Sequence, residues 1–487
     1  MIIKRILIGC IALALFLGNA HALQAGNLLN GQSHPTGLKP LTAVENDSIQ
    51  KNWRRINKVH LNSLGQNRIN KALKKRNKAR SAAINTSSIV ADTKDLEFQA
   101  NPALSASSTV SAVALTKGTG AVATVTATLP SAVDNSQTIW FPPIGDQGNL
   151  GSCASFAITY YQLSYTQARD KNIAINTGNN NYIYSPKFVY NLVNGGQDNG
   201  SSIMAPYTLL ANHGAPSMAD FAYDSNYRAW PLDAKTWRNA LNARTIVPGY
   251  VENLNTNTGL QQLKELLNNG HVVGFATDIF NWQYAAVKNN PNTADDDLLV
   301  GQFIAYYSKG SMYTSGHAIT IVGYNDDIWT DINGNGLVEE GELGALKIAN
   351  SWAATWKNSG YIWLSYDALK AVSSVSSAPS AGRNAAIWDN RGYVLLIQSN
   401  YTPKLLGEFT LNQVSRKENI IGIGRYAVNT NSYAKYTSLP AFQSNGGAFA
   451  YNGSTTAVDG TFVVDFTDAL PATVAQAKYG LKISDTL

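Results

Sequence analysis

The scarcity of cysteine is the feature that most constrains this chain. Only two cysteines, Cys10 and Cys153, occur in 487 residues. Residues 1–22 combine a basic start, a short apolar run that includes Cys10, and a small-x-small ending, which is typical of a cleaved secretory signal. The exported chain would keep Cys153 alone. Exported domains normally use cysteines in disulfide pairs, so a single cysteine is a partly buried residue without a chemical role, an intermolecular link or a reactive thiol.

Composition and length indicate a globular protein of several domains. Hydrophobic residues make up 44% of the chain and charged residues 14%, over a length that suits two to four domains. After residue 22 no apolar run approaches the roughly 20 residues that a membrane helix needs. We therefore expect a secreted or periplasmic protein without a membrane span, its signal removed after about Ala22.

Charge is distributed unevenly along the chain. Residues 23–128 hold 14 Lys+Arg and 5 Asp+Glu, a net +9, whereas residues 129–487 hold 22 and 27, a net −5. Within the basic part, residues 45–84 predict a helix or a helix pair broken near Gly65, and residues 104–129 predict a β-hairpin. A basic stretch can bind nucleic acid, but export argues against that partner, and a solvated helix face is the simpler interpretation.

The rest of the chain divides into two parts with different patterns. Residues 129–400 mix helical and strand patterns, as an α/β enzyme does. Within them, Ser185 as a cap and Pro186 at the first helical position predict the start of a helix, and another helix from about Ser202 is predicted to end at Gly214. Residues 401–487 alternate short strand patterns with Gly, Asn and Ser turns and contain no helical pattern, which predicts a separate β-sandwich.

Cys153 lies at the predicted N-terminus of a helix, where a nearby imidazolium would stabilise its thiolate. Three histidines follow residue 129, and two of them, His213 at a helix end and His271 in a turn, are more simply capping or surface residues. His317 begins the strand "HAITIVGY", and "LGALKIAN" should pair with it as a hairpin that places His317 opposite Asn350. An Asn oxygen there would accept from one imidazole nitrogen and leave the other facing the thiol.

Three segments together resemble a known family. "DQGNLGSCASFA" around Cys153, "SGHAITIVGY" around His317 and "NSWAATWKNSGYIWL" from Asn350 resemble the nucleophile, histidine and Asn-Ser-Trp segments of the papain-like cysteine peptidases. The resemblance spans about residues 129–400. It implies an α+β catalytic domain of two lobes, one helical and one β-barrel-like. The residue patterns described above place a mixed helix/hairpin propeptide before this domain and the C-terminal all-β sandwich after it.

The resemblance also implies a catalytic site. Cys153 would be the nucleophile, His317 the base and acid, and Asn350 the residue that orients the histidine. Gln147 would donate its amide to the developing oxyanion, together with the backbone N–H of Cys153.

Further positions follow from the same resemblance. Trp352 would shield the histidine–asparagine contact from water, and Gly195 and Gly196 would hold the substrate backbone. The family usually has Cys where Leu150 stands and Trp where Ala154 stands. The first difference removes a disulfide, in agreement with the single cysteine, and the second alters packing beneath the site.

An insertion at residues 325–342 contains a calcium pattern. "DINGNGLVEEGE" matches D-x-N-x-N-G-x5-E at every specified position, with strands rather than helices expected on either side. The predicted ligands are Asp331, Asn333, Asn335, the Leu337 carbonyl, Glu339 and Glu342. The alternative is an Asn/Gly turn that binds nothing. We expect no cofactor for catalysis and Ca²⁺ as a structural ion that stiffens the catalytic hairpin.

The sequence therefore predicts a secreted cysteine endopeptidase made as a zymogen. Its parts would be a signal (1–22), a basic propeptide (23–128), a peptidase domain (129–400) and a C-terminal β-sandwich (401–487). Proteins or peptides would be its substrates, and the propeptide would inhibit it by electrostatic docking, less so at high salt. The alternatives are an amidase or transpeptidase with the same catalytic residues, or a non-catalytic protein whose C-terminal domain binds glycans or a surface.

Overall fold

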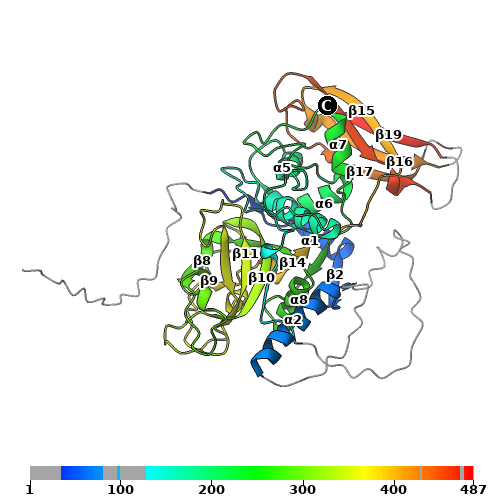
Figure 1. Cartoon of the computed structure of the whole chain (residues 1–487). Helices are drawn as coiled ribbons and strands as arrows, with labels where there is room; N and C mark the ends of the chain where they lie inside the picture. Colours follow the sequence, from blue (N-terminus) through cyan, green and yellow to red (C-terminus); the bar gives the residue numbers. More distant parts are fainter. Residues whose placement is uncertain are drawn as a thin grey trace, which may run out of the picture.

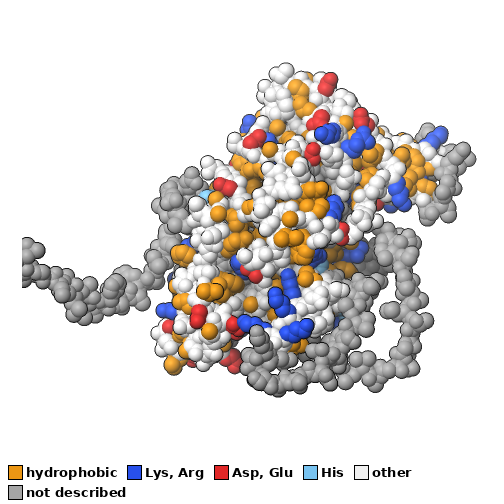
Figure 2. Space-filling view, in the orientation of Figure 1, with side chains coloured by type: hydrophobic (Ala, Val, Ile, Leu, Met, Phe, Trp, Pro, Cys, Tyr) orange, Lys and Arg blue, Asp and Glu red, His pale blue; other side chains and the backbone are white. Residues whose placement is uncertain are grey.

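The computed structural model of the chain describes residues 34–80, 96–98, 128–427, 430, 432–471 and 477–485. The signal predicted at 1–22 and nearly all of the hairpin predicted at 104–129 lie outside the described residues. Figure 1 shows the helices of residues 153–213 in the middle, with the strands of residues 282–349 on one side and the strands of the C-terminal region on the other, and two further helices, of residues 63–80 and 257–268, at the bottom. In the same orientation, Figure 2 shows apolar, basic and acidic side chains interspersed over the surface.

A buried helical rod carries the predicted nucleophile. It begins as α3 (Cys153–Ser155), continues as a π-helical stretch (Phe156–Leu163) and ends as α4 (Ser164–Lys171). Each residue from 153 to 168 is buried, so the rod is enclosed on every side. It stops at Asn172, whose left-handed backbone (φ 51°) suits asparagine at a helix end.

Three more helices complete the helical lobe: α5 (Pro186–Val193), α6 (Met204–His213) and α7 (Ala234–Leu241). The start signal at α5 is confirmed, because the Ser185 hydroxyl accepts from the Phe188 N–H and Pro186 takes the first helical position. The predicted end of α6 at Gly214 is confirmed as well, and that glycine has a positive φ of 63°.

The second lobe is a twelve-stranded sheet in the order β13-β9-β12-β11-β10-β7-β14-β6-β2-β3, with β4 beside β10 and β8 beside β9. Helix α8 (Asn257–Asn268) packs against β10. The strands are β2 (Arg54–Val59), β3 (Leu96–Phe98), β4 (Ala132–Asp134), β6 (Gly249–Val251), β7 (Val273–Asp278), β8 (Trp282–Ala286), β9 (Phe303–Lys309), β10 (Gly316–Trp329), β11 (Leu343–Ala349), β12 (Tyr361–Ser365), β13 (Arg383–Asn384) and β14 (Gly392–Val394).

The predicted hairpin is present as β10 and β11, but its register differs from the prediction. Thr320 pairs with Ala349, whereas a register with His317 opposite Asn350 would pair Thr320 with Lys347. Bulges in β10 make the offset vary along the hairpin, and residue patterns alone do not reveal them. Near the site the error is two residues, which keeps each side chain on its expected face.

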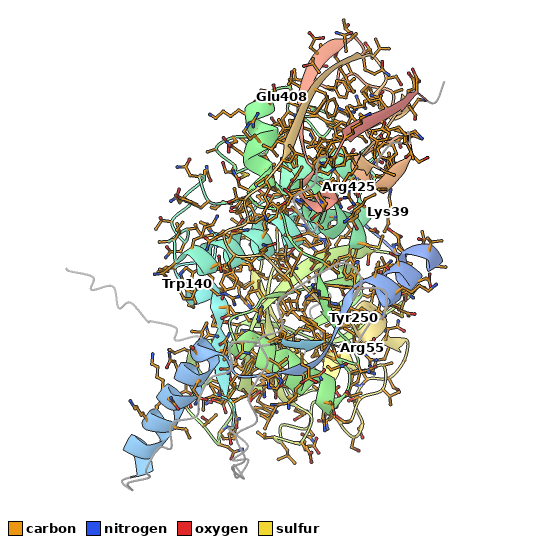
Figure 3. All side chains as sticks on the ribbon, turned by 90° about the vertical axis from the view of Figure 1, so that its right-hand side faces the viewer. Lys39, Arg55, Trp140, Tyr250, Glu408 and Arg425 are labelled. Carbon is orange, nitrogen blue, oxygen red and sulfur yellow. The ribbon has the colours of Figure 1, made fainter. Side chains whose placement is uncertain are left out.

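Residues 34–98, where described, form a leader that is built into both lobes. Its elements are β1 (Leu38–Lys39), α1 (Ala43–Asn52), β2, α2 (Ser63–Arg80) and β3. The expected break near Gly65 is wrong: the two helices are separated by β2, and Gly65 lies in α2. β2 pairs in parallel with β6, Arg55 opposite Tyr250 (Figure 3). Buried Trp53, Ile56 and Val59 anchor this segment, so tertiary packing overrides its helical pattern.

The C-terminal region packs directly on the helical lobe. It contains the pair β15 (Leu406–Gln413) and β18 (Val458–Asp465), and the sheet β17 (Tyr433–Gln443), β16 (Asn419–Tyr426) and β19 (Tyr479–Asp485). Trp237 of α7 contacts the rings of Phe442 and Phe462. Arg244 binds Asp465 at 2.7 Å and Asp468 at 2.6 Å. The region therefore completes a core that it shares with α6 and α7.

His213 is buried in this shared core, at the end of α6. Its ring lies 6.0 Å from that of Trp237 and 6.1 Å from that of Phe442, and its Nε2 accepts from the Ala441 N–H at 3.4 Å. Burial, helped by the charge of Arg244, lowers the pKa of His213 from 6.5 to about 3. His213 is thus an interior residue, not the surface or capping residue that its position before Gly214 indicated.

We expect the free energy of unfolding to fall as the pH drops from 6.5 toward 3. In that window the unfolded chain binds a proton on His213 while the folded chain excludes it, so acid favours unfolding. His213→Gln, which keeps an acceptor for Ala441, should flatten the dependence of Tm on pH. His60→Gln, on the leader, is the control, and an unchanged slope in His213→Gln would contradict the assignment.

Candidate active site

Backbone N–H groups surround the thiol of Cys153, which is fully buried at the start of α3. Burial raises the pKa of this thiol, and hydrogen bonds from the backbone of Ala318, Gly37, Ala154 and Cys153 itself act in the opposite direction. The helix N-terminus adds positive potential at the same place. Three of these amides belong to the catalytic body, and the fourth, that of Gly37, belongs to the leader.

His317 and Asn350 lie together, as the sequence predicted. The His317 Nε2 is 2.7 Å from the Asn350 Oδ1, and that oxygen also accepts from the Ser351 N–H at 2.8 Å. Because the amide oxygen can only accept, Nε2 must donate, which leaves Nδ1 as the free base nitrogen. Nδ1 is buried and has no hydrogen-bond partner among the described residues. Burial lowers the pKa of His317 to about 4, although the bond to Asn350 raises it.

The amide of Gln147 donates into the space between Gln147, Cys153 and Trp352, here called the cleft, where residues 34–37 of the leader lie. The Gln147 Oε1 accepts from the Ser351 hydroxyl at 2.6 Å, which fixes the orientation of the amide group. Its Nε2 donates to the carbonyl oxygens of Leu150 at 2.8 Å and of Pro35 at 3.2 Å. A carbonyl oxygen of the leader thus occupies the position where Gln147 can donate a hydrogen bond. Ser351 was not predicted as a site residue, although it follows Asn350 directly in the Asn-Ser-Trp segment.

Trp352 covers the histidine. Its ring centroid is 4.6 Å from that of His317, and it also lies near the rings of Trp356 at 5.6 Å, Phe280 at 6.1 Å and the leader's His34 at 5.0 Å. The rings of His34 and Trp352 are stacked with an interplanar angle of 11°. Trp352 is buried and is placed to keep water from the bond between His317 and Asn350.

The leader crosses the cleft in an extended conformation. β1 pairs in parallel with β5 (Ser201–Ser202), and the Ser201 N–H donates to the Gly37 carbonyl at 2.9 Å. A Cβ on Gly37 would lie 1.9 Å from the Gly151 oxygen, so only glycine fits at this position. The cleft is therefore filled by a segment of the same chain.

The residues that pair with the leader are not the ones that we expected to bind the substrate backbone. Gly195 and Gly196 lie against Gly447 and Gly446 of the C-terminal region, and the backbone that pairs with the leader is that of residues 200–202. We therefore correct the assignment of Gly195 and Gly196. Two similar segments, "NGG" at 194–196 and "NGS" at 199–201, follow α5, and sequence alone could not choose between them.

Asp278, which no pattern singled out, fixes the loop before His317. Its carboxylate accepts from the backbone N–H groups of Tyr313, Thr314 and Ser315, each at 2.8 Å, and from the Trp388 indole at 2.7 Å. Charge-assisted bonds of this kind are strong and directional. Asp278 thus sets the position from which β10 begins.

The predicted calcium loop forms a compact turn between β10 and β11. The Asp331 Oδ2 accepts from the Gly336 N–H at 3.2 Å, and the Asp331 Oδ1 is buried without a hydrogen-bond partner among the described residues. Asn333 and Asn335 donate to the Glu339 carboxylate at 2.5 and 2.9 Å. The loop thus gathers the side chains of the calcium pattern within hydrogen-bonding reach of one another.

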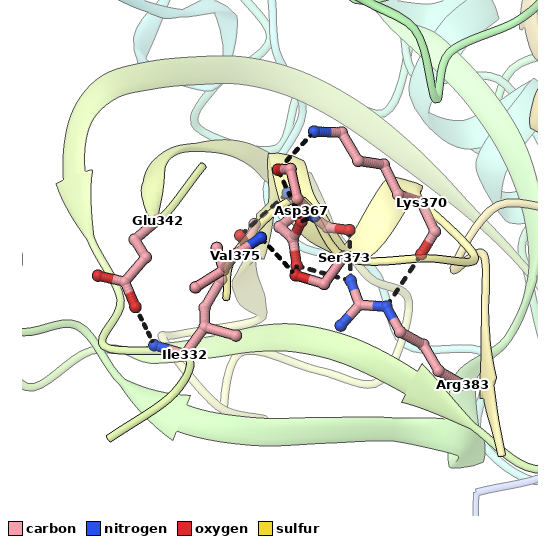
Figure 4. A network of polar contacts seen from close by, with 9 residues as sticks. Ile332, Glu342, Asp367, Lys370, Ser373, Val375 and Arg383 are labelled. Atoms are coloured by element: carbon pink, nitrogen blue, oxygen red, sulfur yellow. Dashed lines mark hydrogen bonds and ion pairs between the residues drawn. The ribbon is translucent and has the colours of Figure 1, made fainter. Parts of the chain in front are cut away.

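Glu342, the last residue of that pattern, is fully buried at the end of the loop. Its carboxylate accepts from the Trp329 indole at 2.9 Å and from the Ile332 N–H at 2.7 Å; Figure 4 draws the second bond beside the network around Asp367. Across the described ranges, no three His, Cys, Asp or Glu side chains form a metal-holding group. A cation here would depend on asparagine and carbonyl oxygens in addition to the carboxylates.

Comparison with known families identifies the class of protein. Residues 129–381, more than half of the chain, match the family described as "Papain family cysteine protease". The chain belongs to the papain family. The expected α+β fold with a helical lobe, a β-lobe and further sheets in the C-terminal region is confirmed.

The solved structures that match this chain are distant from it in sequence. Xylellain, a cysteine protease from Xylella fastidiosa, is 17% identical, with 56% of this chain and 88% of that chain covered and a TM-score of 0.37. Bromelain from Ananas comosus is 18% identical (55% and 100% covered, TM-score 0.36). Procathepsin L 3 of Tenebrio molitor is 14% identical (55% and 70% covered, TM-score 0.36). No curated protein matches. In the described part of the chain, no helix has the length and apolar character to cross a membrane.

We expect the leader to protect Cys153 from alkylation. Gly37→Leu introduces a side chain that would meet the Gly151 carbonyl, so the segment should leave the cleft and the thiol should react with iodoacetamide about tenfold faster or more. The measurement is the alkylation rate of the full chain at neutral pH. Lys39→Leu, at an exposed position of the same segment, is the control and should react at the wild-type rate. Equal rates in wild type and Gly37→Leu would contradict protection.

Proposed function

We propose that this chain is a cysteine endopeptidase that is exported by its signal as an inactive zymogen. The observation that carries the proposal is the placement of three groups at one cleft. His317 is oriented by Asn350, Cys153 lies at a helix N-terminus, and the Gln147 amide is bonded to a carbonyl oxygen. These are the base, the nucleophile and the electrophilic donor that acyl transfer needs.

In the proposed reaction, Nδ1 of His317 takes the proton of the Cys153 thiol, and the thiolate attacks the carbonyl carbon of a peptide bond. Negative charge then develops on the carbonyl oxygen, where the Gln147 Nε2 and the Cys153 N–H can donate to it. One such donor is worth about 3 kcal/mol of transition-state stabilisation. His317 returns the proton to the leaving amine, and water hydrolyses the thioester with His317 acting as base again.

The covered cleft supports an inactive state. Burial raises the pKa of Cys153 and lowers that of His317, so both groups favour their neutral forms while the leader excludes water. When the leader leaves, solvent returns and the thiolate–imidazolium pair becomes accessible. The leader thus inhibits by occupying the cleft and by opposing ionisation of the catalytic pair.

Charge contributes a modest part of leader docking. Among the described residues, two ion pairs join the basic leader to the acidic body, Arg55 to Glu252 at 2.6 Å and Lys75 to Asp295 at 2.9 Å. Exposed pairs of this kind contribute little to binding and weaken in salt. Strand pairing and the buried Trp53 and Ile56 supply contacts that do not depend on charge, so salt should reduce inhibition without abolishing it.

The test is hydrolysis of a mixed fluorogenic peptide library by the full chain, by Gly37→Leu and by a chain that starts at Leu129. We expect hydrolysis in the last two, its loss in Cys153→Ala, and a decrease in kcat of about 10²- to 10³-fold in Gln147→Ala. No hydrolysis with a folded, alkylatable Cys153 would reject the peptidase and favour an amidase or transpeptidase. A folded protein with an unreactive thiol would favour a binding role.

We also propose that the loop of residues 331–342 binds one Ca²⁺ and stiffens the hairpin that carries His317. The buried, unpartnered Asp331 oxygen and the match to the calcium pattern support this proposal. Ca²⁺ should raise Tm by a few degrees relative to EGTA, and Asp331→Ala should remove the difference. Glu340→Ala, at an exposed loop position outside the pattern, is the control. The proposal fails if EGTA changes neither the Tm nor the activity of the wild type.

A further inference from the structure

A carboxylate beside the cleft bonds to the loop that carries the nucleophile. The Asp198 Oδ1 accepts from the Gly151 N–H at 2.9 Å and also from the Tyr190 hydroxyl. Gly151 is two residues before Cys153, so this bond acts on the backbone that leads directly into α3. Neither the sequence patterns nor the proposed catalytic steps assign a role to Asp198.

The same carboxylate is connected to the strand that binds extended peptide in the cleft. The hydroxyl of Tyr190, from α5, accepts from the Gly200 N–H at 3.4 Å while it donates to Asp198. Gly200 immediately precedes β5, whose Ser201 N–H binds the Gly37 carbonyl at 2.9 Å. The loop that leads into Cys153 (residues 147–152, the nucleophile loop) also contacts the residue before β5, because a Cβ on Gly151 would lie 3.2 Å from the Gly200 nitrogen.

No covalent link holds these two segments together in the described chain. Cys153 is a free cysteine, and it is the reacting group of the proposed function. On its other side, the nucleophile loop is held by Tyr223, whose hydroxyl donates to the Gln147 carbonyl at 2.9 Å and lies 2.7 Å from the Ser152 hydroxyl. Hydrogen bonds therefore have to set the distance between the thiol and the strand that presents the peptide.

We propose that Asp198 is a positioning residue for the hydrolysis proposed above: through Gly151 and Tyr190 it fixes the nucleophile loop relative to the peptide-binding strand β5. One oxygen of the side chain, Oδ1, accepts both bonds, so the role requires an acceptor oxygen at this position. Burial and the bond to Asp198 raise the pKa of the Tyr190 hydroxyl, which favours its protonated, hydrogen-bond-donating form. The inference rests on the proposed function, because a fixed distance matters only if Cys153 attacks a bound peptide.

The test uses the full chain with Gly37→Leu, so that the cleft is open, and compares Asp198→Ala, Asp198→Asn and Tyr190→Phe. Asp459→Ala is the matched control, because Asp459 also accepts a side-chain bond, from Asn412 at 2.7 Å, but lies on the C-terminal sheet. Each variant is measured for kcat and KM on a peptide, for the pH dependence of iodoacetamide alkylation of Cys153, and for Tm. Each rate is divided by the fraction of the protein that is folded.

Asp198→Ala should lower kcat/KM by about tenfold or more, slow alkylation and shift its pH profile, because the loop before Cys153 loses its anchor. Asp198→Asn keeps both acceptor bonds and should stay within about threefold of its parent. Tyr190→Phe should mainly raise KM, because it releases Gly200 while Gly151 keeps its bond to Asp198. The control should match its parent.

Two results would overturn the inference. One is a fall in Tm for Asp198→Ala with unchanged rates per folded molecule, which would make Asp198 a stabilising residue only. The other is an equal loss in Asp198→Asn and Asp198→Ala, which would assign the effect to charge rather than to the two bonds. If the parent hydrolyses no peptide, the proposed function fails, while the alkylation profiles still report on the loop.

Discussion

The site depends on the acceptor oxygen of one asparagine side chain. The Asn350 Oδ1 receives the imidazole N–H of His317 and the backbone N–H of Ser351, and the Ser351 hydroxyl then orients the amide of Gln147. One short segment after β11 thus positions both the imidazole of His317 and the amide of Gln147, although these two residues are 170 positions apart in the chain. Because the Asn350 Oδ1 can only accept, His317 must donate from Nε2, and this requirement determines the tautomer of the histidine.

The sequence predicted the parts of this protein that depend on local patterns. It located the start of α5, the end of α6, the β10–β11 hairpin and the closeness of His317 to Asn350. These predictions failed where contacts between distant parts of the chain determine the local structure. β2 has a helical pattern in sequence and becomes a strand because the edge of β6 is available to it. Similar Asn-Gly segments follow α5, and only the fold determines which one faces the cleft.

Other residues of the site could not be predicted because their roles depend on partners that are distant in the chain. Asp278 ends β7 and Asp198 follows α5, and neither stands in a recognisable motif; each accepts hydrogen bonds from residues that are distant in the chain. The register error of two residues comes from bulges between β10 and β11, whereas β10 pairs regularly with β7. A hydrophobic pattern reports which face is buried, whereas hydrogen-bond partners have to be seen in three dimensions.

A single buried cluster contains residues from the beginning, the middle and the end of the chain. It includes Leu38 and Trp53 from the leader, Cys153 from α3, and Phe462 from the C-terminal sheets. During synthesis the final strands emerge last, so the lobe that holds the thiol cannot finish its core until almost the whole polypeptide is present. By then the leader, which is synthesised before both lobes, has long been available to fold into place. The thiol of Cys153 and the leader that covers it therefore become parts of one core as the chain folds.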